Sequence, residues 1–236
     1  MVSAAALCGA AMPARGMNRT VRVWDLPTRL FHWALALAVL GGATTAYVPG
    51  SWIVWHSRFG YAILTLLLFR IVWGFIGGRW SRFSAFIYSP GSVLAHLRGR
   101  AHPDHLIGHS PIGAASVFAM LAVLLAQVGS GLVSDDEIAF QGPLNRFVSS
   151  ATGLTATWYH KQVGQWLLLA LVALHIAAVL YYLLRKKQNL IRPMVAGDKL
   201  TDSAVQPSRD DARSRLAALV VFALCAGAVY LVSRAG

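Results

Sequence analysis

The sequence is poor in charge and in cysteine. Charged residues make up 13% of the chain, whereas soluble domains carry about a quarter, so a soluble class is not expected. The two cysteines, Cys8 and Cys225, lie near the start and in a late apolar stretch, which argues against a disulfide framework. There is no Cys-x-x-Cys-His motif for covalent haem attachment. No nucleophile with a matched base, phosphate loop or carboxylate pair appears, so the sequence does not indicate acid–base catalysis.

Apolar residues dominate the composition: 56% of the chain is hydrophobic and the mean hydropathy is +0.55. A helix needs about 20 mainly apolar residues to cross a bilayer core. Five stretches reach or approach this length, so we expect an all-α membrane protein, a four-helix transmembrane bundle followed by a fifth, C-terminal transmembrane helix. The predicted spans are residues 30–47, 53–77, 112–133, 158–184 and 216–232.

Basic residues gather on one side of the serpentine path that these spans define. The net charge of +12 and the pI near 10.5 would also suit a nucleic-acid-binding protein. Most of the 21 Lys and Arg residues, however, fall in residues 1–29, in loop 78–110 and in segment 185–215. Loops rich in Lys and Arg remain in the cytoplasm. We therefore expect a multi-pass protein in contact with lipid, with its N-terminus in the cytoplasm and no nucleic-acid partner.

The chain is expected to divide into four segments. The first resembles a weak signal peptide, but its basic residue follows the apolar part, which is the wrong order. We expect a start-site artefact there, with Met17 as the true first residue. A surface helix is predicted at residues 89–97. The segments are a leader at 1–20, the four-helix domain at 21–197, a polar cytoplasmic linker at 198–215 and the extra transmembrane helix at 216–236.

The eight histidines fall into two groups. One group belongs to the basic loop, and the other lies within or at the ends of predicted spans. An unpaired ionisable side chain at membrane depth costs several kcal/mol, so such residues are functional candidates. The intramembrane group consists of His32, His56, His160 and His175.

The predicted topology sets these four histidines at two heights. His32 and His175 lie toward the cytoplasmic face, and His56 and His160 open their spans on the outer side. In an α-helix the 15 residues between His160 and His175 correspond to about 22 Å of rise and roughly 60° of rotation, so both imidazoles point to a similar face. Two level-matched pairs are therefore expected.

Each pair has the chemistry of a b-type haem site. Two imidazoles from facing helices can clamp one haem iron, so the spacing predicts two haem b groups. Gly60 and Gly164 follow a histidine by four residues and would leave room for a flat macrocycle, although glycine is also common at membrane helix interfaces. Arg58 and Arg70 are candidate propionate contacts. The alternatives are an interfacial role for any single histidine and snorkelling for the two arginines.

Two polar clusters outside the spans give weaker functional predictions. The loop histidines would suit a metal site by their spacing, but no acid or cysteine completes one. The acidic residues near 135 could steer a basic partner such as a periplasmic c-type cytochrome, and loop solubility is the alternative. The clusters are His96, His102, His105 and His109, and Asp135, Asp136 and Glu137.

Several motifs together resemble the bacterial cytochrome b-561 family of integral-membrane b-type cytochromes. They are VWDLPTRLFHW, WHSRFGY, GHSPIG and LHIAAVLYYLLRKKQNLIRPM, and the likeness covers roughly residues 21–197. The resemblance implies an inner-membrane four-helix bundle with two bis-histidine haems that moves electrons between quinone and a partner. It places the iron ligands on the same four histidines. One quinol-reactive type of member has a further histidine where this chain has Tyr182, so Tyr182, Lys187 and His109 are only candidate quinone contacts.

Three functional hypotheses follow. The favoured one is a di-haem cytochrome that passes electrons between the quinone pool and an outer-side electron carrier or small oxidant. The second is a membrane-anchor cytochrome subunit of a larger respiratory dehydrogenase, such as a hydrogenase. The third is a non-redox metal transporter that uses the histidines as ligands, against which the near absence of intramembrane carboxylates speaks.

Overall fold

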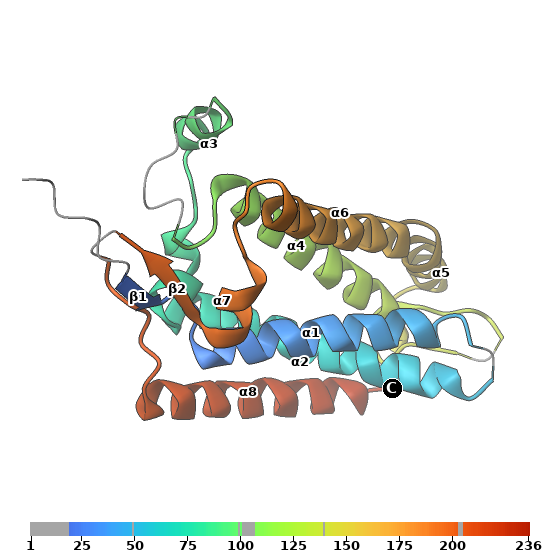
Figure 1. Cartoon of the computed structure of the whole chain (residues 1–236). Coiled ribbons are helices and arrows are strands. Elements are labelled where there is room, and N and C mark those ends of the chain that lie inside the picture. Colours follow the sequence, from blue (N-terminus) through green and yellow to red (C-terminus); the bar gives the residue numbers. More distant parts are fainter. Residues whose placement is uncertain (1–18, 49, 99, 101–106, 139, 203–204) are drawn as a thin grey trace, which may run out of the picture.

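The computed structural model of this chain is mostly helical, as predicted (Figure 1). It describes residues 19–48, 50–98, 100, 107–138, 140–202 and 205–236, so the leader lies almost wholly outside the described residues. The long helices are α1 (Leu26–Thr45), α2 (Trp52–Ile76), α4 (Pro111–Val133), α6 (Gln165–Leu184) and α8 (Ala212–Ser233). The shorter elements are β1 (Arg19–Arg22), α3 (Pro90–Leu97), α5 (Ser150–Trp158), α7 (Ile191–Ala196) and β2 (Asp198–Thr201).

Among the described residues, four helices are long and apolar enough to cross a membrane: α2, α4, the continuous helix Ser150–Leu184 and α8. The first predicted span, α1, has 20 residues but is not among them. Its sequence includes Arg29 and His32 near one end and two threonines at the other, which lowers its hydropathy. The C-terminal helix thus has the properties of a span, while the total of five spans remains a prediction.

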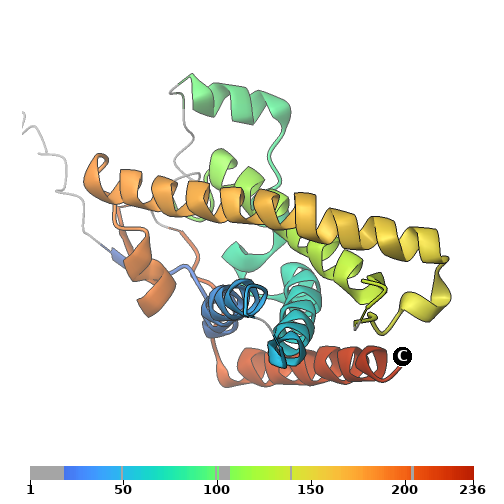
Figure 2. The same cartoon turned by 90° about the vertical axis from the view of Figure 1, so that its right-hand side faces the viewer.

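The long helices pack in three layers, with the α1–α2 hairpin between α8 on one side and α4 and α6 on the other (Figures 1 and 2). Helices α1 and α2 form a hairpin, and α8 lies along α2 on the side away from α4 and α6. The buried residues of α8 recur at intervals of four and seven, which places them on one stripe. This stripe meets the α1–α2 core, where Phe222 contacts Phe69 with ring centroids 6.2 Å apart. The stripe consists of Ser214, Ala218, Cys225 and Val229.

One end of the bundle, which we call the sheet end, is closed by a two-stranded ribbon. Strand β1 pairs antiparallel with β2. Residues that precede α1 therefore lie against residues that follow α6, the helix that contains His175. Gly197, at φ 90°, turns the chain into β2, and its carbonyl accepts hydrogen bonds from Val23 N and Trp24 N. Ser208 Oγ donates to Val23 O at 2.7 Å. The predicted linker is therefore packed against the N-terminal segment rather than extended in solvent.

Ion pairs centred on Asp210 hold the same segment in place. Arg22 and Arg215 each approach its carboxylate at 3.0 Å, and Leu26 N donates to it at 3.2 Å. Burial alone would raise the pKa of Asp210, but these hydrogen bonds and the charges of Arg215 and Arg22 lower the pKa below its ordinary value. The start of α8 is thereby tied to the start of α1.

Asp25 joins the first two helices at the sheet end. Its side chain caps α1 by accepting from Thr28 N at 2.8 Å, as an N-cap aspartate does. It also accepts hydrogen bonds from Trp73 Nε1, Gly78 N and Ser81 Oγ at 3.2, 3.0 and 2.7 Å. The carboxylate is fully buried, and these four bonds stabilise its charge.

The opposite end, which we call the turn end, contains the α1–α2 turn and loop 134–149. Gly50 has φ 84° in the turn. In the loop, the acidic side chains bind the local backbone: Asp135 Oδ1 accepts from Glu137 N at 2.8 Å, and Asp136 Oδ1 accepts from Phe140 N at 2.9 Å. The predicted surface helix forms as α3, which stands apart from the layered helices at the sheet end (Figure 1).

Candidate functional site

The structure brings together the two histidine pairs expected from the sequence. His32 of α1 faces His175 of α6, with ring centroids 6.4 Å apart and planes inclined at 51°. His56 of α2 faces His160, with centroids 5.9 Å apart and planes at 84°. The first pair lies toward the sheet end and the second toward the turn end. Each pair joins one helix of the α1–α2 hairpin to the long helix 150–184.

Both pairs have the spacing of two imidazoles bound to one iron. Imidazole nitrogen binds a metal at about 2 Å. The separation of the two ring centroids is the sum of two iron–nitrogen distances and the two distances from each nitrogen to the centre of its ring. For two imidazoles on one iron this sum is about 6 Å. The residues therefore fit haem on the separation of their rings.

Hydrogen bonds orient both rings of the turn-end pair. His56 Nδ1 lies 2.9 Å from Gly42 O, and His160 Nδ1 lies 2.8 Å from Gln127 O. A carbonyl oxygen only accepts, so each Nδ1 carries the proton and each Nε2 keeps a lone pair for a metal. Such second contacts fix the tautomer and raise the basicity of a ligand histidine.

His160 lies in a π-helical turn, η5 (Tyr159–Gly164), between α5 and α6. A π-turn interrupts the regular hydrogen-bond ladder and occurs frequently at functional sites. Gln127 of α4 reaches this turn, where its Nε2 donates to His160 O at 3.1 Å. The 60° rotation expected for a regular α-helix therefore does not apply, because the π-turn changes the phase between His160 and His175.

Ser130 is the second α4 residue at this ring. Its Oγ donates to Gln127 O at 2.9 Å and lies 3.3 Å from His160 Nδ1. A Cβ at Gly131 would lie 3.1 Å from His160 Cε1, so glycine leaves room for the imidazole. None of these three α4 residues was predicted as functional, although Gln127 and Ser130 are polar positions three residues apart in an apolar span.

The sheet-end pair has no comparable support. No hydrogen bond to His32 or His175 occurs within the described part of the chain, and His32 Nδ1 is buried without a partner. His32 makes an edge contact with Trp33, at 5.1 Å between centroids. The rings are held by packing alone.

Arg70 is a buried positive charge near the sheet end. Its side chain is 3% exposed, its guanidinium lies 4.7 Å from the centroid of Phe83 and 6.0 Å from that of Phe86, and its Nη1 has no hydrogen-bond partner among the described residues. A buried unpaired cation is costly, so the site suits an added carboxylate such as a haem propionate. Arg58, by contrast, is exposed and lies over Trp55 at 4.7 Å.

The two predicted glycines differ. A Cβ at Gly60 would meet nothing within 4 Å, so the face four residues after His56 is open. A Cβ at Gly164 would collide with Gln127 Oε1 and lie 2.9 Å from Tyr159 Cε1. The missing side chain of Gly164 thus accommodates Gln127, whereas Gly60 leaves unfilled space.

The three candidate quinone contacts are not brought together by any contact within the described residues. His109 lies between Trp24 and Phe86, with centroids 4.7 and 4.4 Å away. Burial, followed by the charges of Arg70 and His32, lowers the pKa of His109 to about 3. Tyr182 contacts Tyr181, and Lys187 is exposed with φ 55°.

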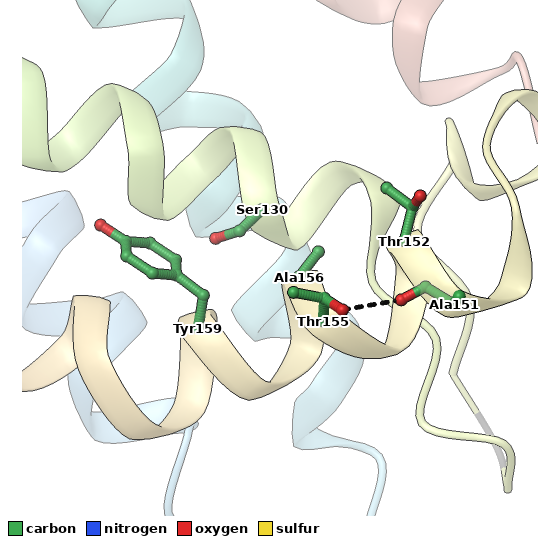
Figure 3. A pocket seen from close by; sticks show the side chains of 6 residues that line it. All are labelled: Ser130, Ala151, Thr152, Thr155, Ala156 and Tyr159. Carbon is green, nitrogen blue, oxygen red and sulfur yellow. Dashed lines mark hydrogen bonds between the residues drawn. The ribbon is translucent and has the colours of Figure 1, made fainter.

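The predicted loop-histidine cluster falls partly outside the described residues, which exclude His102 and His105. In the described ranges no group of three metal-binding side chains occurs. A hollow of about 430 Å³ lies between α4 and α5, beside the turn-end pair (Figure 3). Its lining is formed by Ser130, Ala151, Thr152, Thr155, Ala156 and Tyr159.

Imidazole pairs held between apolar helices, each at the separation of a bis-imidazole iron site, define the class of membrane haem proteins. The family model described as "Prokaryotic cytochrome b561" matches residues 23–197, and the chain belongs to this family. It is thus a transmembrane b-type cytochrome of electron transport. Helix α8 lies beyond the matched residues.

Curated proteins similar to this chain are named as probable cytochrome subunits of Ni/Fe hydrogenases. The chain is 25% identical to the "Probable Ni/Fe-hydrogenase B-type cytochrome subunit" of Bradyrhizobium diazoefficiens, over 83% of this chain and 92% of the relative. It is 27% identical to the protein of the same name from Azotobacter vinelandii, over 75% and 87%. It is also 27% identical to the "Probable Ni/Fe-hydrogenase 1 B-type cytochrome subunit" of Escherichia coli K12, over 74% and 88%.

Proposed function

We propose that this chain is a di-haem cytochrome that passes single electrons between membrane quinone and an outer-side electron carrier or small oxidant. His32 and His175 would hold one haem b, and His56 and His160 the other. The observation that supports this most directly is the separation of 6.4 and 5.9 Å between the ring centroids, found twice at two levels of the same helices. When bound, haem supplies a one-electron iron couple.

Groups of the protein itself would bind the haems and orient the histidine ligands. Gly42 O and Gln127 O hold the turn-end imidazoles with Nε2 free. Arg70 would neutralise a propionate of the sheet-end haem through its unpaired Nη1. Gly60 would leave room beside the turn-end macrocycle. Arg58, exposed near His56, is a second propionate candidate that solvent screens more strongly.

The sheet end would face the cytoplasm. It contains β1, β2 and α7, whose surroundings include most of the basic residues outside the spans. The positive-inside rule then places the N-terminus in the cytoplasm and the turn end outside the bacterial inner membrane. The haem domain would comprise residues 21–197, with 198–215 as its cytoplasmic connection to the additional helix. Tyr182, Lys187 and His109 remain the quinone candidates on the cytoplasmic side.

Purified full-length chain tests the proposal. A reduced-minus-oxidised spectrum should show a b-type α-band, and the haem-to-protein ratio should be two. A ratio of one would mean that one pair does not hold iron. The absence of the band would favour the metal-transport alternative.

The printed names of the relatives favour a second candidate, a cytochrome subunit of a larger dehydrogenase of the hydrogenase type. Mild detergent extraction of the tagged chain from its native membrane distinguishes the two. A stoichiometric catalytic subunit would support the second candidate, and a solitary haem protein would support the first. A bound c-type cytochrome would identify the outer carrier.

A further inference from the structure

We propose that the sheet end binds the head group of an acidic phospholipid, at the segment where the chain leaves α6 and turns back toward α1. We call this segment, residues 184–195, the basic turn. The inference is independent of haem binding, since the basic turn includes none of the paired histidines. It follows from three properties of the basic turn: unpaired positive charge, a backbone fixed by hydrogen bonds, and apolar side chains at the surface.

The basic turn carries positive side chains and no negative one. The acidic residues nearest to it in the sequence are Glu137 and Asp198. Its cations are all exposed, and none forms an ion pair with a residue that the structure describes. They are Arg185, Lys186, Lys187 and Arg192.

Other cations at the sheet end are already paired within the chain. Arg22 lies 2.8 Å from Asp198 and 3.0 Å from Asp210, and Arg215 lies 3.0 Å from Asp210. Arg29 Nη2 lies 3.9 Å from the same carboxylate. These carboxylates hold the β1–β2 ribbon and the start of α8, whereas no described residue balances the charge of the basic turn.

Hydrogen bonds fix the backbone of the basic turn. Gln188 N donates to a carbonyl of α6 at 3.0 Å, and Lys187 takes φ 55° where the chain leaves that helix. Asn189 Oδ1 then accepts from Ile191 N and Arg192 N at 3.0 and 2.9 Å, at the start of α7. A fixed backbone presents the charges together, so binding costs less conformational entropy than it would for a disordered tail.

Two hydrogen bonds from α1 hold the basic turn beside that helix (Figure 1). Arg29 Nη1 donates to Val195 O at 2.6 Å, and Trp33 Nε1 donates to Met194 O at 3.2 Å. The basic turn therefore connects the end of α6 with the first turns of α1. A head group bound to it would lie next to both helices.

Apolar side chains are exposed beside these charges. Leu184, Ile191 and Val195 of the basic turn are exposed, as are Leu30 and Trp33 of α1. A soluble anion such as phosphate gains nothing from such side chains, whereas the glycerol and acyl chains of a phospholipid would cover them. Tryptophan is also enriched where a membrane meets water. Unpaired cations together with exposed apolar surface at the end of a transmembrane helix therefore favour a lipid.

The charges also select the kind of head group. Guanidinium and ammonium groups bind phosphate oxygens through charge-assisted hydrogen bonds. A zwitterionic head group brings its own cation to the site, so a head group with net negative charge is favoured. Clusters of Lys and Arg just beyond the cytoplasmic end of a transmembrane helix bind acidic lipids in this way. The site thus agrees with the cytoplasmic position proposed for the sheet end.

Thermal unfolding of the purified full-length chain in detergent tests the ligand class. Added phosphatidylglycerol should raise the midpoint of unfolding by several degrees, and salt should reduce this shift. Phosphatidylcholine and inorganic phosphate should leave the midpoint unchanged. An equal shift with phosphatidylcholine would show that any phospholipid suffices, and an equal shift with inorganic phosphate would show a site for a soluble anion. Either result would overturn the inference.

Removal of charge tests the place of the site. The variant that combines Arg185→Gln, Lys186→Gln, Lys187→Gln and Arg192→Gln should lose the shift caused by phosphatidylglycerol. The control variant removes the same charge from exposed arginines spread over the rest of the chain, and it should retain the shift. An equal loss in the control would mean that net charge alone is responsible, which would overturn the inference. The control combines Arg19→Gln, Arg82→Gln, Arg146→Gln and Arg234→Gln.

Two milder variants decide the outcome if the fourfold variant does not fold. Lys186→Gln combined with Lys187→Gln should reduce the shift caused by phosphatidylglycerol. Lys186→Arg combined with Lys187→Arg keeps the charge and should preserve the shift. An unchanged shift in the glutamine pair, or an equal reduction in both pairs, would show that the positive charge of the basic turn does not bind the lipid.

Discussion

The two ends of the bundle hold their histidines by different means. At the turn end, both rings are oriented by backbone carbonyls, and a π-turn presents one of them. At the sheet end, His32 and His175 make no such bonds with the residues that the structure describes, but the surrounding polypeptide is fixed by Asp25, by Asp210 and by the β1–β2 ribbon. The turn-end site is thus ordered by hydrogen bonds to the histidine rings themselves, and the sheet-end site by the polypeptide that surrounds the rings. The comparison shows that equal ring spacing does not require equal support.

The largest effect is expected from two single variants, each of which removes one histidine ligand from one end of the bundle. His160→Ala and His175→Ala should each reduce the bound haem from two per chain to one, because a single imidazole no longer clamps the iron. The pyridine haemochrome assay on purified protein measures this ratio. His96→Ala, in α3 away from both pairs, is the matched control and should retain two. Full haem in both ligand variants would contradict the assignment.

Filling the open face at Gly60 should act almost as strongly, and only at the turn end. Gly60→Leu would occupy the space that a macrocycle needs, so we expect loss of most turn-end haem with α2 still folded. Gly227→Leu in α8 is the control, because a Cβ there also meets nothing within 4 Å. Haem stoichiometry and circular dichroism report the two properties. An unchanged stoichiometry in Gly60→Leu would contradict the proposal that a macrocycle occupies this face.

Asp25→Asn should weaken the sheet end alone. The amide places a donor against groups that donate, so a buried network is broken at a cost on the order of 3 kcal/mol. We expect the sheet-end haem to be released at a lower temperature than the turn-end haem, measured by absorbance during heating. Asp202→Asn, at an exposed position, should behave as wild type. Simultaneous release of both haems would argue against two independently supported ends.

Gln127→Leu should weaken the turn end by a smaller amount. It removes the hydrogen bond to His160 O in the π-turn, a loss of about 1 kcal/mol, while the Gln127 backbone carbonyl remains. The turn-end haem should dissociate faster, as measured by transfer to a haem-accepting protein. Gln206→Leu, which removes an exposed hydrogen bond to Arg79 at the other end of the bundle, is the comparison variant and should show the wild-type rate.

Acid should loosen the sheet end through Asp210. Because the folded state lowers the pKa of Asp210, its carboxylate stabilises the fold above the ordinary pKa of 3.8, and this contribution is lost as pH falls through the lower folded value. Tryptophan fluorescence, which reports Trp24 and Trp80 nearby, should change below pH about 4. Asp210→Asn should be less stable at neutral pH and lack this transition.

The sequence predicts the histidine pairs because depth in a membrane follows from counting residues along apolar spans. It also predicts α2, α4, α6 and α8 and the surface helix α3, because the composition of each of these segments is enough by itself to indicate a helix. The same counting does not reveal that helix 150–184 contains a π-turn, since its hydrogen bonds depend on Gln127 of another helix. Gly164 illustrates the limit: its spacing from His160 suggested room for haem, whereas a contact across helices explains its size.

The ribbon at the sheet end was not predicted either, and the reason is sequence distance. Arg22 and Asp198, which form an ion pair at 2.8 Å, are 176 positions apart. Residues 198–215 read as a polar linker because their apolar content is low, and their order depends on charges supplied from the first residues of the fold. Charge complementarity of this kind has no periodicity along the chain.

Pairing β1 with β2 also has a temporal consequence. A ribosome releases β1 before any span, yet its partner strand is synthesised only after the helix that carries His175. The contacts that β1 makes with β2 at the sheet end can therefore form only after residues 198–201 have been synthesised.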